Sequence, residues 1–331
     1  MDTVNILLSS PMFDEENLGK ITSVSPRVKV QDIWELARTD LKGDSAARDE
    51  LDNLLADTEV VYCLRMPRDL ITRAPKLKWV QVMSAGVDRF LDADFRKSPV
   101  ILTNVSGMHA TPIGEFVMEQ MLMFAKNAAF CFDLKQKKQW QRYSTSVLRG
   151  KTVGIVGLGN IGREVARLSK AFGMRVVATR RSAPRIQRTR NVDLMLPRQE
   201  LPRLLAESDY VVITLPYTRE THNLFGEKEL KTMKPSAYLI NIGRGGIVDE
   251  DVLVRALAEK WIAGAGLDVF ATEPLPPESK LWDLPSLLFS PHVSGDMEDY
   301  FGQATDVFCK NLKRYLEGKR LFNVVNKQRG Y

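Results

Sequence analysis

The sequence is poor in the residues that build disulfide frameworks and zinc sites. Its 331 residues include only three histidines and three cysteines, Cys63, Cys131 and Cys309, which are odd in number and far apart. No C-x-x-C motif or cluster of cysteine and histidine is present. A disulfide scaffold needs pairs of cysteines, and structural zinc needs a cluster of such ligands. We therefore expect neither disulfides nor a bound metal.

Long hydrophobic runs are also missing. No apolar stretch reaches the roughly 20 residues that cross a bilayer. The first residues lack the basic and then apolar pattern of a secretion signal. We therefore expect a cytoplasmic protein that has no membrane contact.

Positive charge exceeds negative charge only slightly. Lys and Arg number 47 against 41 Asp and Glu, which gives a net charge of +6 spread along the chain. Because no nucleic-acid recognition motif accompanies this excess, we expect no nucleic-acid partner, and we interpret the bias as favouring small anionic ligands. With 44% hydrophobic residues, a chain of this length suggests two globular domains rather than one.

The segment 151–184 is the most informative part of the chain. An apolar, β-branched run, Val153–Val156, predicts a strand, and an amphipathic helix pattern that ends at Gly173 leads to a second strand, Met174–Thr179. Between the first strand and the helix stands a G-x-G-x-x-G motif, formed by Gly157, Leu158, Gly159, Asn160, Ile161 and Gly162. Strand, glycine turn, helix and strand in this order predict a dinucleotide-binding unit.

Each glycine of the motif has its own task in that prediction. Gly157 permits a tight turn, Gly159 lets the backbone approach a pyrophosphate, and Gly162 lets the helix pack close to the strand. The pyrophosphate would lie at the helix N-terminus, where free N–H groups and the helix dipole favour an anion. A purely structural glycine turn is the alternative, because any glycine-rich turn can match the motif.

The end of the second strand lacks an acidic residue. A carboxylate there would bind the ribose hydroxyls of NAD, whereas Thr179 is followed by Arg180, Arg181 and Ser182. Two guanidinium groups and a hydroxyl suit a 2′-phosphate. We therefore predict NADP(H) as the cofactor in preference to NAD(H). A solvated basic loop is the alternative, since more arginines follow at positions 185, 188 and 190.

Predicted strands and helices alternate through the rest of the chain. Strands are predicted at 4–8, 60–64, 79–83, 100–102, 192–196, 210–215, 237–242, 262–267 and 287–289. Helices are predicted at 30–37, 51–56, 113–130, 200–207, 226–231, 249–260 and 298–317. This alternation predicts an α/β fold with parallel, doubly wound sheets, in which ligands gather at the carboxyl ends of the strands.

Several short segments follow the predicted strand ends. In the larger half of the chain these segments are Leu215 with Pro216, the Gly243–Gly245 turn, Asp268 and His292. In the first part, a strand ends in a turn of small residues formed by Ser84, Ala85 and Gly86. Such a turn exposes backbone N–H groups that suit a substrate carboxylate, although it would also serve as a plain strand–helix connection.

The three histidines limit the search for an acid or base. His109 precedes Ala-Thr-Pro in a segment between the predicted domains, where a hydrogen-bonding role is expected, and His222 lies in a polar stretch where we expect solvent. His292 follows an apolar strand in Ser290-Pro291-His292-Val293-Ser294-Gly295. A turn at the carboxyl end of a cofactor-binding sheet suits a catalytic histidine, and a structural role remains the alternative.

Three blocks carry a family resemblance. They are Asn241 to Glu250 (NIGRGGIVDE), Gly266 to Pro276 (GLDVFATEPLP) and Ser290-Pro291-His292. Together with the glycine motif they resemble the signature blocks of the D-2-hydroxyacid dehydrogenases, over a region from about residue 80 to the end of the chain. The resemblance implies hydride transfer to the keto carbon of a small 2-oxo acid such as glyoxylate, hydroxypyruvate or a pyruvate-like acid. Formate and phosphite oxidation also occur in this family.

The resemblance also implies roles for individual residues. His292 would be the general acid, Glu273 would hydrogen-bond it and favour the imidazolium, and Arg244 would bind the carboxylate and carbonyl oxygens of the substrate. Ser84, Ala85 and Gly86 would receive the substrate carboxylate through backbone groups. The implied cofactor contacts are the glycine motif, Arg180, Arg181, Ser182, Leu215, Pro216, Ile242, His292 and Asp268, the last of which would hold the nicotinamide carboxamide.

The implied architecture has two Rossmann-like, doubly wound domains. A dinucleotide-binding domain, residues 104–295, would be inserted into a discontinuous flavodoxin-like substrate domain, residues 1–103 and 296–331. The family pattern further implies a homodimer through the dinucleotide domain, where Trp140 is a candidate anchor. The substrate's side chain would be selected in the first domain, with Arg65 as a candidate contact. The alternative function is a nucleotide-sensing, corepressor-like binding protein of the same fold.

Overall fold

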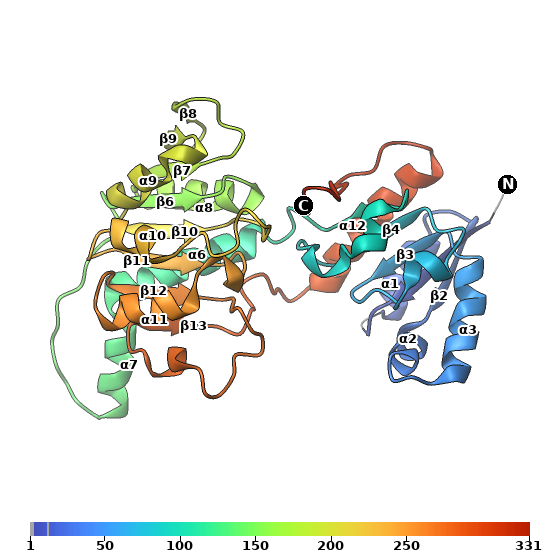
Figure 1. The fold of residues 1–331 in the computed structure, drawn as a ribbon, viewed down its shortest axis with the longest axis horizontal. Helices are drawn as coiled ribbons and strands as arrows, with labels where there is room; N and C mark the ends of the chain where they lie inside the picture. Colours follow the sequence, from blue (N-terminus) through green and yellow to red (C-terminus); the bar gives the residue numbers. More distant parts are fainter. Residues whose placement is uncertain (1–2, 12) are drawn as a thin grey trace. The chain divides into compact units, whose positions relative to one another are not determined.

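The computed structural model describes residues 3–11 and 13–331. The chain forms two compact units. Unit 1 combines Met1–Met108 with Met297–Tyr331, and unit 2 comprises His109–Asp296. Their helices and strands carry the labels of Figure 1.

Unit 1 is built on a five-stranded parallel sheet of order β2-β1-β3-β4-β5. Its strands are β1 (Val4–Ser9), β2 (Val28–Asp32), β3 (Val60–Cys63), β4 (Trp79–Val82) and β5 (Ile101–Thr103). Its helices are α1 (Glu15–Thr22), α2 (Trp34–Asp40), α3 (Ser45–Ala56), α4 (Leu70–Arg73), α5 (Ala93–Lys97) and α12 (Tyr300–Leu316).

Both faces of this sheet are covered by helices (Figure 1). One core contains residues of α2, α3, α4 and α5, and the other contains residues of α1 and α12. In the second core Phe308 of α12 stacks on Tyr62 of β3, with ring centroids 4.2 Å apart. The C-terminal helix therefore completes the unit that the first part of the chain begins. Burial on both faces explains why β3 is a continuous apolar run, and all four residues of β4 are likewise buried, including the polar Gln81.

The sequence-based prediction of a helix at 30–37 was wrong in its first half. Val28 and Val30 belong to β2, an edge strand, and the helix α2 begins only at Trp34. Along β2 the more buried valines alternate with exposed lysine and glutamine. This period of two is the pattern of a half-buried strand, which the search for helical spacing missed.

Unit 2 is built on an eight-stranded sheet of order β13-β12-β11-β10-β6-β7-β9-β8. Its strands are β6 (Thr152–Val156), β7 (Arg175–Thr179), β8 (Gln187–Thr189), β9 (Val192–Leu196), β10 (Tyr210–Ile213), β11 (Tyr238–Asn241), β12 (Gly264–Leu267) and β13 (Leu287–Phe289). All neighbours are parallel except the antiparallel pair β8 and β9; the sequence predicted β9 but not the short strand β8.

Two layers of helices cover the sheet of unit 2. One core contains residues of α9 (Leu201–Glu207), α10 (Glu227–Thr232) and α11 (Glu250–Ala258). The other core contains residues of α6 (Ala110–Lys126) and α8 (Asn160–Ala171). The parallel strands with helices on both faces form the doubly wound arrangement that the sequence predicts.

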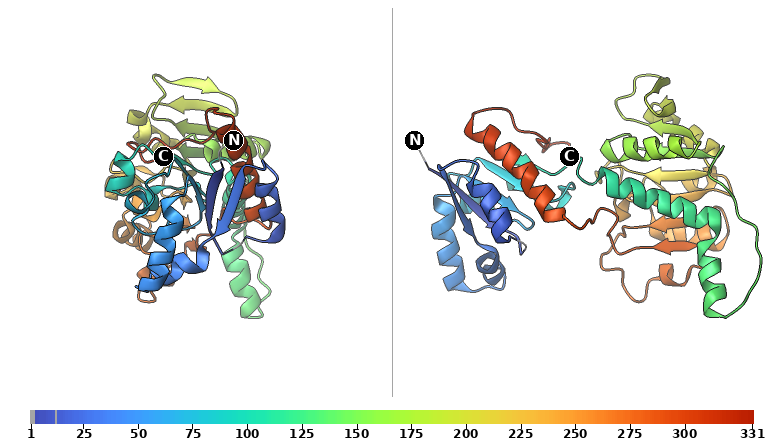
Figure 2. Two further views of the ribbon diagram at one scale, coloured as in Figure 1. Left: turned by 90° about the vertical axis from the view of Figure 1, so that its right-hand side faces the viewer. Right: turned by 180° about the vertical axis from the view of Figure 1, so that it is seen from behind.

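The long helix predicted at 113–130 is two helices in the structure. Asn127 has a left-handed backbone, φ 50°, and separates α6 from α7 (Ala128–Gln136). Asparagine tolerates this conformation better than most residues and ends the helix there. Beyond α7 the chain returns to β6 without regular structure, along the outside of unit 2 (Figure 2). Trp140 lies on this return with 97% of its surface exposed.

Candidate active site

The carboxyl ends of six neighbouring strands in unit 2 are aligned. In strand order the aligned last residues are Thr179, Val156, Ile213, Asn241, Leu267 and Phe289. The candidate cofactor and catalytic residues that the sequence predicts for this half of the chain each follow one of these six ends, at most six residues beyond it. In a parallel sheet, residues that follow aligned strand ends gather along one edge. The structure therefore brings most of these residues to one edge.

The glycine motif forms the turn from β6 into α8. Gly157 has φ 106°, a left-handed conformation that favours glycine. A Cβ atom on Gly162 would lie 2.2 Å from the carbonyl oxygen of Gly157, so only glycine allows the helix to pack this close to the turn. A Cβ atom on Gly159 would meet no protein atom within 4 Å, and this residue precedes the first turn of α8. Its backbone is therefore open to an approaching ligand, which fits a pyrophosphate.

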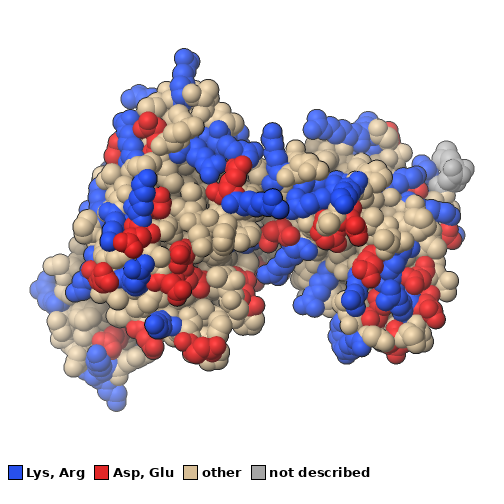
Figure 3. Space-filling view, in the orientation of Figure 1, with Lys and Arg blue, Asp and Glu red and all other residues tan. Residues whose placement is uncertain are grey.

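The basic residues after β7 lie next to this turn. Val156 and Thr179 are register partners, and the N–H of Gly157 donates to the carbonyl oxygen of Thr179. Arg180, Arg181 and Ser182 are exposed, and among the described residues no acidic side chain pairs with Arg180. Lys and Arg side chains gather over the β7–β9 end of unit 2 (Figure 3). A phosphate beside the glycine turn would meet these positive charges.

Two further strands complete the predicted cofactor edge. Leu215 and Pro216 follow β10, and Ile242 follows β11. A Cβ atom on Gly243 would lie 2.8 Å from the carbonyl oxygen of Leu215, so these two turns are in close backbone contact. The buried Ile242 anchors the second turn in the core shared with α6 and α8.

His292 and Glu273 form a direct pair. The Nδ1 atom of His292 lies 2.8 Å from Oε2 of Glu273, and the other carboxylate oxygen accepts the N–H of Phe270 at 3.0 Å. The glutamate is therefore oriented from both sides. The side chain of His292 remains 41% exposed, so its second ring nitrogen can reach a ligand.

Asp268 holds the turn that carries His292. This carboxylate is 1% exposed and follows β12. Its oxygens accept from the hydroxyls of Ser290 and Ser294 and from the N–H groups of Val293 and Ser294. These bonds engage both carboxylate oxygens, and the structure thus gives Asp268 a positioning task that the sequence did not indicate.

Arg244 follows β11 on a turn that is held by Asn241. The side-chain amide of Asn241 donates to the carbonyl oxygen of Arg244 at 3.0 Å, and its oxygen accepts from the N–H of Gly243 at 3.1 Å. The half-buried guanidinium donates to the carbonyl oxygen of Gly243 at 2.8 Å. A guanidinium carries five N–H donors in a planar fork, a geometry that suits a carboxylate.

His109 lies closer to the candidate site than its sequence position indicates. Its ring is buried, and a Cβ atom on Gly295, in the turn that holds His292, would lie 3.0 Å from it. Burial lowers the pKa of His109, and the positive charge of Arg244 lowers it further. Nothing in the local sequence reveals this neighbour, because the two residues are far apart in the chain. His222, in contrast, is exposed and contacts the hydroxyl of Tyr217 at 3.1 Å.

In unit 1, the turn Ser84–Gly86 directly follows β4. The hydroxyl of Ser84 donates to the carbonyl oxygen of Gly86 at 2.7 Å. The side-chain amide of Asn104 donates to the carbonyl oxygen of Ala85, also at 2.7 Å. Among the described residues, none accepts from the N–H groups of Ala85 and Gly86. Arg65 is exposed on the neighbouring turn after β3, whose Cys63 is the register partner of Val82. The turn therefore combines open backbone donors with a nearby basic residue, as an anion site requires.

Within residues 3–11 and 13–331 no helix is both long and apolar enough to cross a membrane. The same residues contain no group of three or more histidines, cysteines and carboxylates arranged to hold a metal ion.

Residues 118–294 match the D-isomer specific 2-hydroxyacid dehydrogenase family over its NAD binding domain. The chain belongs to this family. A glyoxylate reductase of Aeropyrum pernix is 36% identical over 284 residues, which cover 82% of this chain and 84% of the relative. Glyoxylate/hydroxypyruvate reductase B of Pectobacterium carotovorum is 38% identical over 275 residues, covering 80% and 83%.

Solved structures show the same architecture over the whole chain. An NADPH-dependent glyoxylate/hydroxypyruvate reductase of Sinorhizobium meliloti, solved with NADP and sulfate, has a TM-score of 0.84 at 28% identity and covers 99% of this chain and 100% of its own. A family member of Xanthobacter autotrophicus, solved with NADPH and MES, has a TM-score of 0.83 at 25% identity and covers 100% of both chains. The predicted family and the α/β fold with two Rossmann-like domains are confirmed, and the protein is an oxidoreductase of the 2-hydroxy acid class.

Proposed function

We propose that this dehydrogenase is an NADP(H)-dependent reductase of small 2-oxo acids, with glyoxylate and hydroxypyruvate as the first candidates. The observation that carries the proposal is the 2.8 Å contact between His292 and Glu273 at the sheet edge that also holds Arg244 and the glycine turn. Relatives named glyoxylate reductase at 32–38% identity support the substrate class. Nothing in these relatives' names favours the corepressor-like alternative.

The proposed cofactor is NADP(H). The open backbone at Gly159 suits a pyrophosphate, and Arg180, Arg181 and Ser182 offer donors to a 2′-phosphate where an NAD-specific site would have a carboxylate. Structural relatives solved with NADP or NADPH support this choice. Bound NADPH would supply the hydride that reaches C2 of the substrate. Asp268 remains our candidate for the nicotinamide carboxamide, in addition to its observed bonds to the His292 turn.

In the proposed reaction, His292 protonates the keto oxygen while hydride reaches the keto carbon, which yields the 2-hydroxy acid. Its Nδ1–H is held by Glu273, so the proton leaves from Nε2, and the carboxylate stabilises the imidazolium before transfer. Arg244 binds the substrate's carboxylate and carbonyl oxygens, which orients the keto group and polarises it. In unit 1, we assign the substrate carboxylate to the N–H groups of Ala85 and Gly86, within the turn that Ser84 closes.

A substrate panel with both cofactors tests this function. The purified protein is mixed with NADPH or NADH and with glyoxylate, hydroxypyruvate, pyruvate or no acid, and the absorbance of the reduced nicotinamide is followed. We expect consumption of NADPH with glyoxylate or hydroxypyruvate and slower consumption of NADH. If a protein that binds NADPH consumes none of it with any 2-oxo acid, the corepressor-like alternative is favoured instead.

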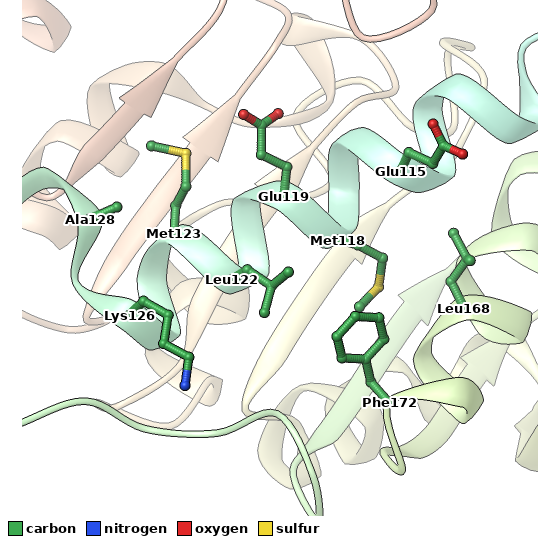
Figure 4. Close-up of a pocket in the computed structure, with 9 residues that line it drawn as sticks. All are labelled: Glu115, Met118, Glu119, Leu122, Met123, Lys126, Ala128, Leu168 and Phe172. Atoms are coloured by element: carbon green, nitrogen blue, oxygen red, sulfur yellow. The ribbon is translucent and has the colours of Figure 1, made fainter.

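We also propose a homodimer formed through unit 2. The outer side of α6 and α8 forms an open, mainly apolar groove of about 550 Å³. Figure 4 shows Met118 and Leu122 of α6 facing it, and Phe172, at the end of α8, lies against Met118. Exposed apolar surface of this kind marks contact sites. Trp140, exposed on the chain that follows α7, is a second candidate contact.

A further inference from the structure

One peptide group stands between the Arg244 turn and the His292–Glu273 pair. It joins Phe270 to Ala271 and contains the N–H of Ala271, while the N–H of Phe270 belongs to the peptide group just before it; each N–H donates to a carboxylate. Phe270 donates to Oε1 of Glu273 at 3.0 Å, and Ala271 donates to Oε1 of Glu250 at 2.6 Å. Glu250 belongs to α11 and is not one of the proposed catalytic residues. It nevertheless hydrogen-bonds the same stretch of backbone that orients Glu273.

Gly245 packs against this peptide from the other side. A Cβ atom at Gly245 would lie 1.9 Å from the carbonyl carbon of Phe270 and 2.3 Å from the nitrogen of Ala271. Real Cβ atoms do not come this close to backbone, so any side chain at 245 would push the peptide away. Because Gly245 directly follows Arg244, the backbone that carries the guanidinium rests on the backbone that orients Glu273.

Helix capping does not account for Glu250. Asp249 already caps α11, since its side chain accepts the N–H of Val252 at 3.1 Å. The carboxylate of Glu250 instead binds a backbone group that lies 21 residues further along the chain. Its bond therefore joins two loops rather than ending a helix.

Ionisation of the Glu250 carboxyl group lowers the stability of the folded protein. Burial raises its pKa, and the neighbouring charges of Asp251 and Glu273 raise it further, against the opposing effect of the Ala271 N–H. An acid with a raised pKa in the folded state stabilises the fold below its unfolded value, and this stability is lost as pH rises through the folded pKa. At any pH above the folded pKa the ionised group therefore lowers the stability of the fold, which is typical of groups retained for function.

We propose that Glu250 and Gly245 are positioning residues. Together they fix the Phe270–Ala271 peptide, and through it they set the placement of Arg244 relative to Glu273 and His292. The proposal rests on the reductase function proposed above. Neither residue touches the reacting atoms, so each acts only through the geometry of the others.

The test compares Glu250→Ala and Glu250→Gln with Asp251→Asn. Asp251 lies in the same helical turn, and its replacement removes the same charge without touching the peptide. Glu250→Ala should lower kcat about 10- to 10²-fold, as expected when reacting groups are misplaced by about 1 Å. Its pH–rate profile should shift, while NADPH affinity, measured by fluorescence, should stay within about twofold of the parent. Glu250→Gln retains an oxygen acceptor for the Ala271 N–H and should recover most of the lost rate, and Asp251→Asn should match the parent.

A second pair of variants changes the glycine. Gly245→Ala drives a methyl group into the peptide and should lower kcat as Glu250→Ala does. At Gly246 an added Cβ would meet only the side chain of Tyr217, at 2.8 Å, which can move aside, so Gly246→Ala is the matched control. Equal kcat values for these two variants would contradict the proposal, as would a parental kcat and pH profile in Glu250→Ala.

Amide hydrogen exchange separates this proposal from the reductase function. In Glu250→Ala the peptides covering 266–274 should exchange faster than in the parent, with or without substrate, and Glu250→Gln should restore protection. Unchanged exchange would show that Glu250 does not hold the peptide. If the parent turns over no 2-oxo acid, the proposed function fails, and the exchange comparison still decides whether Glu250 holds the peptide.

Discussion

At residue 292 the backbone has φ 57°, a left-handed conformation that histidine adopts only occasionally. The surrounding structure enforces it, because Asp268 binds the hydroxyl of Ser290 on one side of the histidine and the backbone of Val293 and Ser294 on the other. Uncommon backbone conformations persist where the environment determines them and are frequent at functional sites. The turn thereby presents the ring to Glu273 and leaves its far side exposed.

The first prediction concerns this ring. His292→Ala should lower kcat for reduction about 10²-fold or more, because general acid catalysis contributes that much. The affinity for NADPH, measured by fluorescence titration, should remain close to that of the parent, since the histidine acts on the keto oxygen. Near-normal turnover in the variant would remove His292 from the mechanism.

The second prediction concerns His109. Its pKa is lowered by burial and by Arg244, so the unfolded chain takes up a proton at a higher pH than the folded chain does. The stability from this group is complete above about pH 6.5, its unfolded value, and is lost as pH falls through the folded pKa. Melting temperatures measured from pH 7.5 to pH 5 should therefore fall more steeply for the parent than for His109→Gln. Parallel curves would contradict the assignment, because His222 and His292 are present in both proteins.

At the scale of elements, sequence reasoning succeeded where the pattern is local. The unit β6–α8–β7 was predicted because hydrophobic spacing, glycines and strand length all lie within 30 neighbouring residues. It failed where one residue outweighs the pattern, as at Asn127, or where an edge strand is short and half exposed, as in β2 and β8.

The arrangement of the candidate site was predictable only in part. Residues after strand ends could be assigned to one edge, because parallel strands align their carboxyl ends. Other contacts join residues that are far apart in the chain. Gly245 packs against the Phe270–Ala271 peptide, Glu250 accepts the N–H of Ala271, and His109 lies near Arg244. Their backbones meet only after tertiary packing, so no spacing in the sequence could reveal them.

The turn after β7 carries the third prediction. Arg180→Asp should place an acceptor near the ribose hydroxyls and repel a 2′-phosphate. Each charge-assisted contact contributes about 1.5–3 kcal/mol, so the loss of one should reduce preference for NADPH over NADH about tenfold or more, mainly through the KM of the cofactor. Arg163→Asp on the exposed side of α8 is a control for general charge. Equal use of both cofactors by the parent would favour the solvated-loop alternative.

At the scale of the whole molecule, the fourth prediction concerns assembly. Sedimentation at micromolar concentration should give twice the chain mass of 37.4 kDa. Leu122→Asp would bring a charge into the groove along α6 and should shift the protein towards the monomer, since an unpaired buried charge is costly. The matched control is Leu41→Asp, at an exposed position in unit 1, and this variant should remain dimeric. A parent that sediments as a monomer would contradict the proposed dimer.

The central claim is that hydride from NADPH is delivered to C2 of a 2-oxo acid. Because the family is D-isomer specific, we expect the D-2-hydroxy acid as the product. The direct measurement uses hydroxypyruvate and NADPH carrying deuterium at the transferring position of the nicotinamide, with the product analysed by NMR and chiral chromatography. We predict D-glycerate with deuterium at C2, formed about 10²-fold or more slowly when His292→Ala replaces the parent. L-glycerate, a product without deuterium at C2, or consumption of NADPH that does not depend on the 2-oxo acid would contradict the account.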